Sequence, residues 1–281
     1  MNNLKSWWSN DLSRGVKIVL LVLLANGLPA FIILMTLPGM TDLLFVWTIK
    51  PVINARLIGV MYANAMLLVG FSAFQTEWKN VRTNLVVITL FSVFATTLTF
   101  FFLKPFLAHP WYHLAYWLTM YLVLFFAAPY VFFTQEKKHG GKLPIQVPLN
   151  FPARLIAGIF SLTSLVIGLG LIFKIDLVNL YWPWTLPPLV GGLIGVLFLT
   201  HAAAYAWAVW DGDWLRTRSI FWQAPLTALL FILLPLLHPG DLNPDPGNSL
   251  VIYFLITGIF GFSFLAVILG FQKRSKGSEN V

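Results

Sequence analysis

The chain has 281 residues, of which 58% are hydrophobic and only 10% are charged, and its mean hydropathy is +0.80. An ordinary soluble domain is about 45–50% apolar and about 25% charged. Because so few charged side chains cannot form a polar shell, the composition excludes a soluble enzyme, a disordered chain and a nucleic-acid-binding domain with an exposed basic face. We therefore interpret the net charge of +8 as membrane topology rather than as a nucleic-acid-binding surface.

The first apolar segment predicts a membrane span. This run is about twenty residues long and continues into Leu37-Pro38-Gly39 without an obvious small-residue cleavage site. We expect a retained first helix rather than a signal peptide. The sequence contains no cysteine, which excludes disulfides, thiolate metal sites and cysteine nucleophiles.

Eight segments meet the requirement of about 20 mostly apolar residues for a membrane helix. Their continuous apolar character, without strict alternation, favours helices over a β-barrel. The sequence therefore predicts an all-α polytopic membrane protein with eight transmembrane helices. The predicted spans are 16–36, 54–74, 84–104, 112–134, 153–174, 188–210, 217–238 and 249–271.

The basic residues predict the orientation. With the N-terminus inside, most of the 18 Lys and Arg residues fall on cytoplasmic segments, whereas Lys50, Lys104, Lys174 and Arg56 fall on the opposite side. Cytoplasmic loops of membrane proteins carry an excess of Lys and Arg, so we expect both termini to be cytoplasmic. The residues assigned to the cytoplasmic side are Lys5, Arg14, Lys17, Lys79, Arg82, Lys137, Lys138, Lys142, Arg154, Arg216, Arg218, Lys273, Arg274 and Lys276.

Internal similarity predicts a duplication. An acidic-Trp pair with a downstream Arg occurs at 77–82 and again at 213–218, an offset of 136 residues. Segments 47–51 and 57–60 likewise match 184–188 and 193–196. We predict two four-helix membrane repeats, 1–138 and 150–281, joined by a cytoplasmic linker at 139–149. Because four is an even number, the second repeat enters the membrane in the same orientation as the first, so the repeats are parallel.

The duplicated pattern resembles a loosely defined group of uncharacterised bacterial eight-span integral membrane proteins. The first copy reads Trp47, Thr48, Pro51, Ala55-Arg56, Gly59, Glu77-Trp78 and Arg82. The second copy reads Trp184, Thr185, Pro188, Gly195, Asp213-Trp214 and Arg218, with Gly192-Leu193 where the arginine of the first copy would stand. The resemblance implies the eight-span architecture and a location in the bacterial inner (plasma) membrane, and it implies no activity.

The repeated acidic-Trp-Arg motif has two interpretations. Each copy could bind a lipid headgroup, a phosphate or a partner on the cytoplasmic side. Alternatively, and in our favoured interpretation, the tryptophans anchor an interfacial hairpin, Asp213 caps the next helix, and its carboxylate pairs with Arg218. The six residues concerned are Glu77, Trp78, Arg82, Asp213, Trp214 and Arg218.

Span six contains the clearest candidate for a site inside the membrane. His201 lies near its middle and Tyr205 lies one turn further on, on the same face. Intramembrane ionisable residues usually mark function. One interpretation is a ligand or proton site; the other, which we favour, is a neutral histidine bonded to a neighbouring helix. Asn26, Asn64 and Gln223 should also find partners across helices, so we predict a buried polar pocket formed by His201, Tyr205, Asn64 and Gln223.

The sequence predicts no metal site and no catalytic constellation. His109 and His113 are four residues apart, but Pro110 between them disfavours the helical turn that a shared metal would need. The sequence contains no glycine-rich phosphate loop, HExxH motif or nucleophile elbow. We therefore expect no cofactor, no metal and no enzymatic activity.

These observations leave several functional hypotheses. The leading one is a non-enzymatic accessory or scaffold protein that packs with membrane lipid or with membrane-protein partners, and not with nucleic acid. The alternative is a transporter or binding protein for a small apolar or lipidic molecule, with its site between the repeats. A weaker third hypothesis is an enzyme that acts on lipid through the repeated acid and arginine. A cavity lined by His201, Tyr205, Asn64 or Gln223 would favour the alternative.

Overall fold

Long apolar helices make up most of the structure, a computed structural model that describes residues 11–245 and 247–278. The chain is 82% helical, and the described residues form no β-strand. Eight helices are long and apolar enough to cross a membrane, which confirms the predicted all-α, eight-span fold. They are α2 (Arg14–Thr36), α4 (Val52–Ala73), α5 (Trp78–Phe101), α7 (Trp111–His139), α8 (Phe151–Phe173), α10 (Pro188–Asp211), α11 (Trp214–Leu237) and α12 (Gly247–Ser278).

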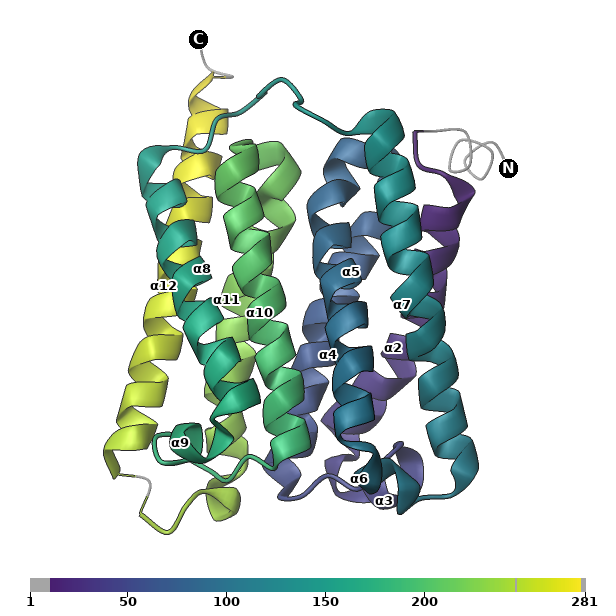
Figure 1. Cartoon of the computed structure of the whole chain (residues 1–281). Coiled ribbons are helices and arrows are strands. Elements are labelled where there is room, and N and C mark those ends of the chain that lie inside the picture. Colours follow the sequence, from purple (N-terminus) through teal and green to yellow (C-terminus); the bar gives the residue numbers. More distant parts are fainter. Residues whose placement is uncertain (1–10, 246, 279–281) are drawn as a thin grey trace.

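The two ends of the helix bundle differ in structure (Figure 1). One end, here called the linker side, contains the tight connections 74–77 and 212–213 and the segment 140–150. The other end, the loop side, contains the longer connections 37–51, 102–110, 174–187 and 238–245. Short helices occupy these longer connections: α3 (Thr41–Leu44), α6 (Leu103–Leu107), α9 (Ile175–Asn179) and the 3₁₀ turns η1 (Pro38–Met40) and η2 (Pro239–Asp241).

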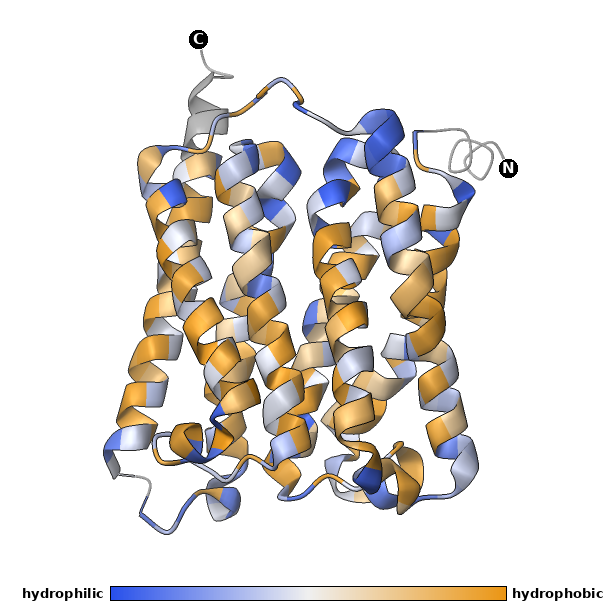
Figure 2. Cartoon of the chain, viewed as in Figure 1, coloured by the Kyte–Doolittle hydropathy of each residue, from blue (hydrophilic) through white to orange (hydrophobic). Residues whose placement is uncertain are grey.

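Four helices form the centre of the molecule. α10 packs against α5, and α11 packs against α4 and α5, so these contacts join the two halves of the chain. α2 covers α4, α7 covers α5, α8 covers α10 and α12 covers α11 (Figure 1). The central α4 and α10 are the most buried spans, whereas α2, α8 and α12 expose most of their apolar side chains. These hydrophobic outer faces suit contact with lipid (Figure 2).

Corresponding elements of the two halves have corresponding neighbours. Besides the helix pairs, Trp47 and Trp184 both lie fully buried in the connection that precedes a central helix. Trp47 packs edge-on against Trp117, and Trp184 packs edge-on against Tyr253. These matching contacts agree with two parallel repeats, although the duplication itself stays a prediction.

Several local features fix the helix ends and the closest helix pair. The side chains of Ser13, Asn150 and Asp213 accept hydrogen bonds from the first turns of α2, α8 and α11. α8 and α10 approach closely at Gly168 and Gly195, where a Cβ on Gly195 would lie 2.9 Å from the Gly168 carbonyl oxygen. Small residues permit this approach inside a membrane.

Candidate ligand-binding site and buried charge network

A group of polar side chains joins the two halves within the membrane-spanning region. Thr227 of α11 donates to the side-chain oxygen of Asn64 on α4, and Nε2 of Gln223 donates to the Asn64 carbonyl at 3.1 Å. Ser219 of α11 also donates to Asn84 of α5 at 2.7 Å. Asn64 and Gln223 thus each have a hydrogen-bond partner on another helix, as expected from the sequence. These bonds satisfy polar groups that lipid could not.

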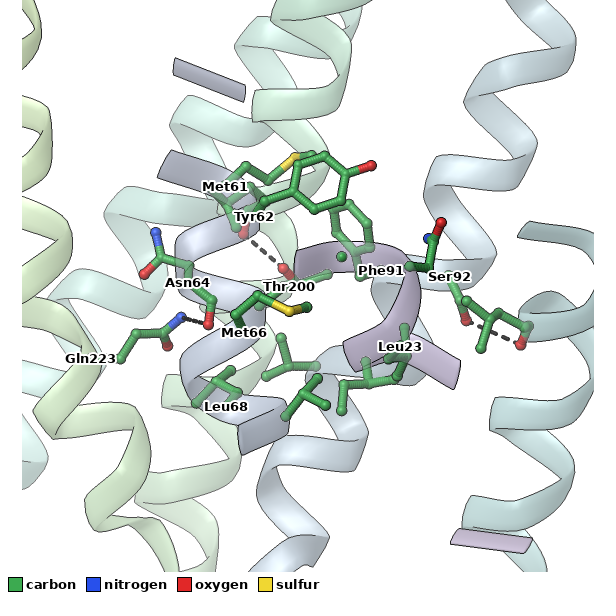
Figure 3. A pocket seen from close by; sticks show the side chains of 18 of the residues that line it. Leu23, Met61, Tyr62, Asn64, Met66, Leu68, Phe91, Ser92, Thr200 and Gln223 are labelled. Atoms are coloured by element: carbon green, nitrogen blue, oxygen red, sulfur yellow. Dashed lines mark hydrogen bonds between the residues drawn. The ribbon is translucent and has the colours of Figure 1, made fainter. Parts of the chain in front are cut away.

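A small cavity of about 60 Å³ lies beside this polar group, lined mostly by the first half and closed by α10 and α11. Its lining includes Asn64, Gln223, Thr200 and His201, and it has room for a few water molecules. Figure 3 shows Asn64, Thr200 and Gln223 around it, together with the apolar side chains that form the rest of its wall. Of the predicted polar pocket, Asn64, Gln223 and His201 thus meet at one cavity.

His201 is held by its own helix. Its Nδ1 lies 2.7 Å from the carbonyl oxygen of Leu197, one turn earlier on α10. The preceding turn offers a carbonyl at short range, so this bond lies within α10, and a bond from His201 to a neighbouring helix stays a prediction. A carbonyl can only accept, so Nδ1 carries the hydrogen and Nε2 carries the lone pair of the neutral ring.

A larger cavity of about 450 Å³ lies within the second half, among α8, α10, α11 and α12. It is not between the halves, where the sequence analysis expected a binding site. His201 and Tyr205 both line it, and none of the described lining residues carries a permanent charge. Most of its wall is apolar or aromatic, with contributions from Phe160, Ile167, Phe198, Phe231, Tyr253 and Trp182.

Three polar side chains at the larger cavity have an atom without a hydrogen-bond partner among the described residues: Nε2 of His201, the hydroxyl of Tyr205 and Nε1 of Trp182. His201 and Tyr205 are buried, with 7% and 0% of their surface exposed, and their rings lie 6.1 Å apart. Leaving a buried polar group unsatisfied costs about 1–3 kcal/mol. Most buried polar groups do have partners, so His201 and Tyr205 are groups at which a molecule bound in the cavity would gain hydrogen bonds.

The larger cavity reaches the outer surface between α8 and α12. Val166 of α8 and Ile252 and Ile256 of α12 line it, yet each also exposes about half of its surface to the surroundings of the bundle. An apolar molecule dissolved in lipid could therefore enter sideways, without crossing water.

The acidic-Trp-Arg motifs do not form the ion pairs that the sequence suggested. Asp213 does cap α11, but its carboxylate lies 3.6 Å from Arg216 rather than near Arg218, which packs over the ring of Phe71. Arg216 lies one turn into α11 and faces Asp213, whereas the side chain of Arg218 reaches Phe71 of the first half. Glu77 likewise pairs with Lys79, at 2.8 Å.

The two motif tryptophans are buried instead of anchoring the protein at the lipid headgroups. Trp78 is 1% exposed, and its Nε1 donates to Glu136 at 3.0 Å. Trp214 stacks on Phe271 with ring centroids 4.3 Å apart. Both tryptophans therefore pack inside the protein, whereas the sequence predicted that they lie at the membrane interface.

A buried charge network forms where the halves meet at the linker side. Arg82 of α5 pairs with Glu136 of α7 and lies 3.7 Å from Asp211 of α10, and Arg82 and Asp211 each expose only 2% of their side chains. Asp211 also accepts from Nε of Arg216 at 2.7 Å. Glu136 and Asp211 were not among the site residues predicted from the sequence. Their position at the ends of predicted spans is the only signal that could have indicated them.

The linker is bonded to the second half at this network. The backbone N–H groups of Gln146 and Val147 donate to Asp213, and Nη1 of Arg216 donates to the Pro144 carbonyl at 2.8 Å. Trp214 N–H also donates to the Val147 carbonyl at 2.7 Å. Asp213 and Arg216 therefore fix the linker; they are not free to bind a phosphate.

The loop-side histidines make local contacts. His109 hydrogen-bonds Thr48 at 3.0 Å and stacks on His113 at 5.6 Å, while Nδ1 of His238 lies 3.3 Å from Asp241. Within residues 11–245 and 247–278, no group of three or more His, Asp and Glu side chains could hold a metal.

Comparison with family models, curated proteins and solved structures found no match for this chain. The resemblance to uncharacterised bacterial eight-span proteins therefore stays a prediction, and the site geometry carries the functional argument.

Proposed function

We propose that this multi-pass membrane protein binds a neutral lipidic molecule in the larger cavity. The observation that carries the proposal is an apolar cavity of about 450 Å³ that reaches the lipid-facing surface and is lined by His201, Tyr205 and Trp182, each of which has an unsatisfied buried polar atom. Ligand pockets are typically mostly apolar with a few convergent polar groups.

The cavity separates this proposal from the scaffold hypothesis. The apolar outer faces of α2, α8 and α12 suit lipid or partner helices equally, so they do not distinguish the two hypotheses. A scaffold role, however, does not explain a cavity that interrupts the packing between α8 and α12, because each lost contact lowers stability. We therefore rank binding first and a scaffold role second.

We infer that the role is non-enzymatic. The charged side chains that could polarise a substrate are paired with one another on the linker side, as Arg82, Asp211 and Arg216 are. The larger cavity has no charged residue in its described lining.

We also propose two parallel repeats in a bacterial inner membrane, with both termini cytoplasmic. The corresponding helix contacts of the halves support the repeats. The excess of Lys and Arg on segments that belong to the linker side supports the orientation.

Extraction of the bound molecule tests the proposed function. Full-length protein would be purified in mild detergent, and its lipidic content identified by mass spectrometry. Ile256→Trp places a large side chain at the mouth of the cavity, whereas Leu255→Trp changes the adjacent exposed residue, which does not line it. We expect a lipidic molecule enriched over bulk lipid in the wild type and in Leu255→Trp, and its loss in Ile256→Trp.

The contrary result is equally clear. If all three proteins carry only bulk lipid in the same amounts, the binding proposal is wrong. Co-purification of a stoichiometric partner chain with all three would then favour the scaffold hypothesis.

A further inference from the structure

The hydrogen-bonding state of His201 restricts the chemistry of the ligand. Because Nδ1 donates to the Leu197 carbonyl, Nε2 can only accept a hydrogen bond while the ring is neutral. No described group lies in hydrogen-bonding geometry with Nε2, and the nearest polar side chain is that of Gln223 on α11. The missing partner of His201 must therefore be a donor.

Tyr205 places the complementary requirement on the ligand. Its hydroxyl has a hydrogen to donate and has no acceptor among the described residues. The phenol ring is fixed by stacking on Phe264 at 4.9 Å. A partner of Tyr205 must therefore offer a lone pair.

The lining excludes an ionised ligand group. An anionic headgroup buried here would lack a cation, and an ammonium group would lack a carboxylate, because the described lining residues carry neither. Burying an unpaired charge is far more costly than burying a hydrogen-bonded neutral group. A ketone, ester or ether oxygen accepts from Tyr205 but leaves Nε2 unbonded. A neutral hydroxyl both donates and accepts.

We propose that the ligand is a membrane-soluble alcohol or phenol whose hydroxyl donates to Nε2 of His201 and accepts from the hydroxyl of Tyr205. This inference rests on the proposed function, and it names the chemical class that the larger cavity takes. The two side chains stand one turn apart on α10 with their rings 6.1 Å apart, and both line the larger cavity.

The position of His201 sets the depth of the hydroxyl. His201 is thirteen residues from the start of α10 at Pro188, which corresponds to about 20 Å at 1.5 Å per residue. The hydroxyl is therefore held well inside the membrane, and the hydrocarbon part extends along the cavity towards Leu177 and Tyr181 on the loop side. Such a site selects against ordinary phospholipids, whose headgroups stay at the membrane surface.

Matched ligands test the inference. Radiolabelled hexadecan-1-ol and 1-methoxyhexadecane have the same chain and an acceptor oxygen, but the ether cannot donate. Their binding would be measured with full-length protein in phosphatidylcholine nanodiscs, for the wild type, His201→Leu, Tyr205→Phe and Ile256→Trp. One hydrogen bond corresponds to a preference of up to about tenfold for the alcohol in the wild type.

The two site variants should change ligand binding in different ways. His201→Leu should bind alcohol and ether equally, whereas Tyr205→Phe should weaken both and keep the preference, since both ligands can accept from Tyr205. Equal binding of alcohol and ether to the wild type, with both abolished by Ile256→Trp, would overturn the hydroxyl assignment and leave the cavity as a binding site. Binding of neither, or binding that Ile256→Trp does not change, would overturn the proposed function itself. The wild-type comparison needs no variant to fold.

Discussion

Buried charged side chains in this protein have more than one partner each. Arg82 contacts Glu136 and Asp211, and Asp211 also contacts Arg216. The guanidinium of Arg82 lies in addition over the rings of Trp207 and Trp210, at 5.0 and 5.4 Å. Cation–π contacts and carboxylates together replace the water that these groups lose on burial.

Replacing Arg82 should be strongly destabilising. Arg82→Met leaves Glu136 without its cation and removes one of the cations at Asp211, and breaking a buried pair costs about 3–5 kcal/mol. Unfolding in detergent, followed by tryptophan fluorescence, measures the change. Lys79→Met is the matched control, because Lys79 forms a partly exposed pair that is worth about 1 kcal/mol or less. Equal losses in the two variants would contradict the importance of the buried network.

His238 should make stability depend on pH. Burial lowers the pKa of His238 below its ordinary 6.5, and nearby Arg56 lowers it further, while Asp241 opposes the shift. Between the lowered pKa and 6.5 the unfolded chain binds more protons than the folded one, so stability rises with pH in this window. The contribution is complete above about pH 6.5 and is lost as the pH falls through the folded-state pKa.

Thermal unfolding at a series of pH values would measure this effect. His238→Gln should make the curve flatter between pH 5 and 7, whereas His139→Gln, at the exposed end of α7, serves as the control. An unchanged slope in His238→Gln would contradict the assignment.

At the scale of the helices, hydropathy predicts the spans well but predicts neither side-chain pairing nor short elements. The predicted first span, 16–36, differs from α2 by two residues at one end, because lipid thickness alone demands its length. Glu136 and Arg82 are 54 residues apart in the chain, and their contact depends on how α5 and α7 rotate and pack. The short α3, α6 and α9 have too few residues for a periodic signal.

The candidate site was predictable to a similar degree. His201, Asn64 and Gln223 stood out as polar residues in apolar spans, and they do meet at the smaller cavity. The larger cavity could not be predicted, because an empty volume follows from the mutual positions of α8, α10, α11 and α12. Its wall residues, such as Phe160, are indistinguishable in sequence from ordinary lipid-facing ones.

The closest helix pair offers a test at this scale. Gly195→Ala places a methyl group 2.9 Å from the Gly168 carbonyl and 2.7 Å from Ile172, so α8 and α10 must separate. We expect a loss of about 1–3 kcal/mol in the detergent unfolding assay. Gly158→Ala, on an open part of α8 where no atom lies within 4 Å, should be neutral or stabilising by up to about 1 kcal/mol. The same sign for both substitutions would argue against close packing at Gly195.

At the scale of the whole molecule, polar contacts join two halves that are otherwise packed through apolar surfaces. Asn64, Asn84 and Arg82 of the first half each bond to the second half, at different depths along the central helices. These bonds fix how the halves are placed along the helix axes, since a shift of one turn would break all of them together.

The absence of cysteine makes the orientation directly testable. Lys142→Cys and Gly240→Cys each introduce a single thiol, at exposed positions on the linker side and the loop side. In intact bacterial spheroplasts, a membrane-impermeant maleimide should label Gly240→Cys at once and Lys142→Cys only after permeabilisation. The reverse pattern would show that the termini are outside.

The charge network also bears on the order in which the protein is made. Arg82 and Glu136 both belong to the first four spans, and Asp211 and Arg216 both belong to the last four. Because the chain is made from its N-terminus, Arg82 and Glu136 are synthesised before Asp211 and Arg216. Each of these two pairs contains one cation and one anion. Arg82 and Arg216 therefore each have a carboxylate partner before the two halves pack together. The Arg82–Asp211 contact at 3.7 Å then joins two bundles that each already contain an ion pair of their own.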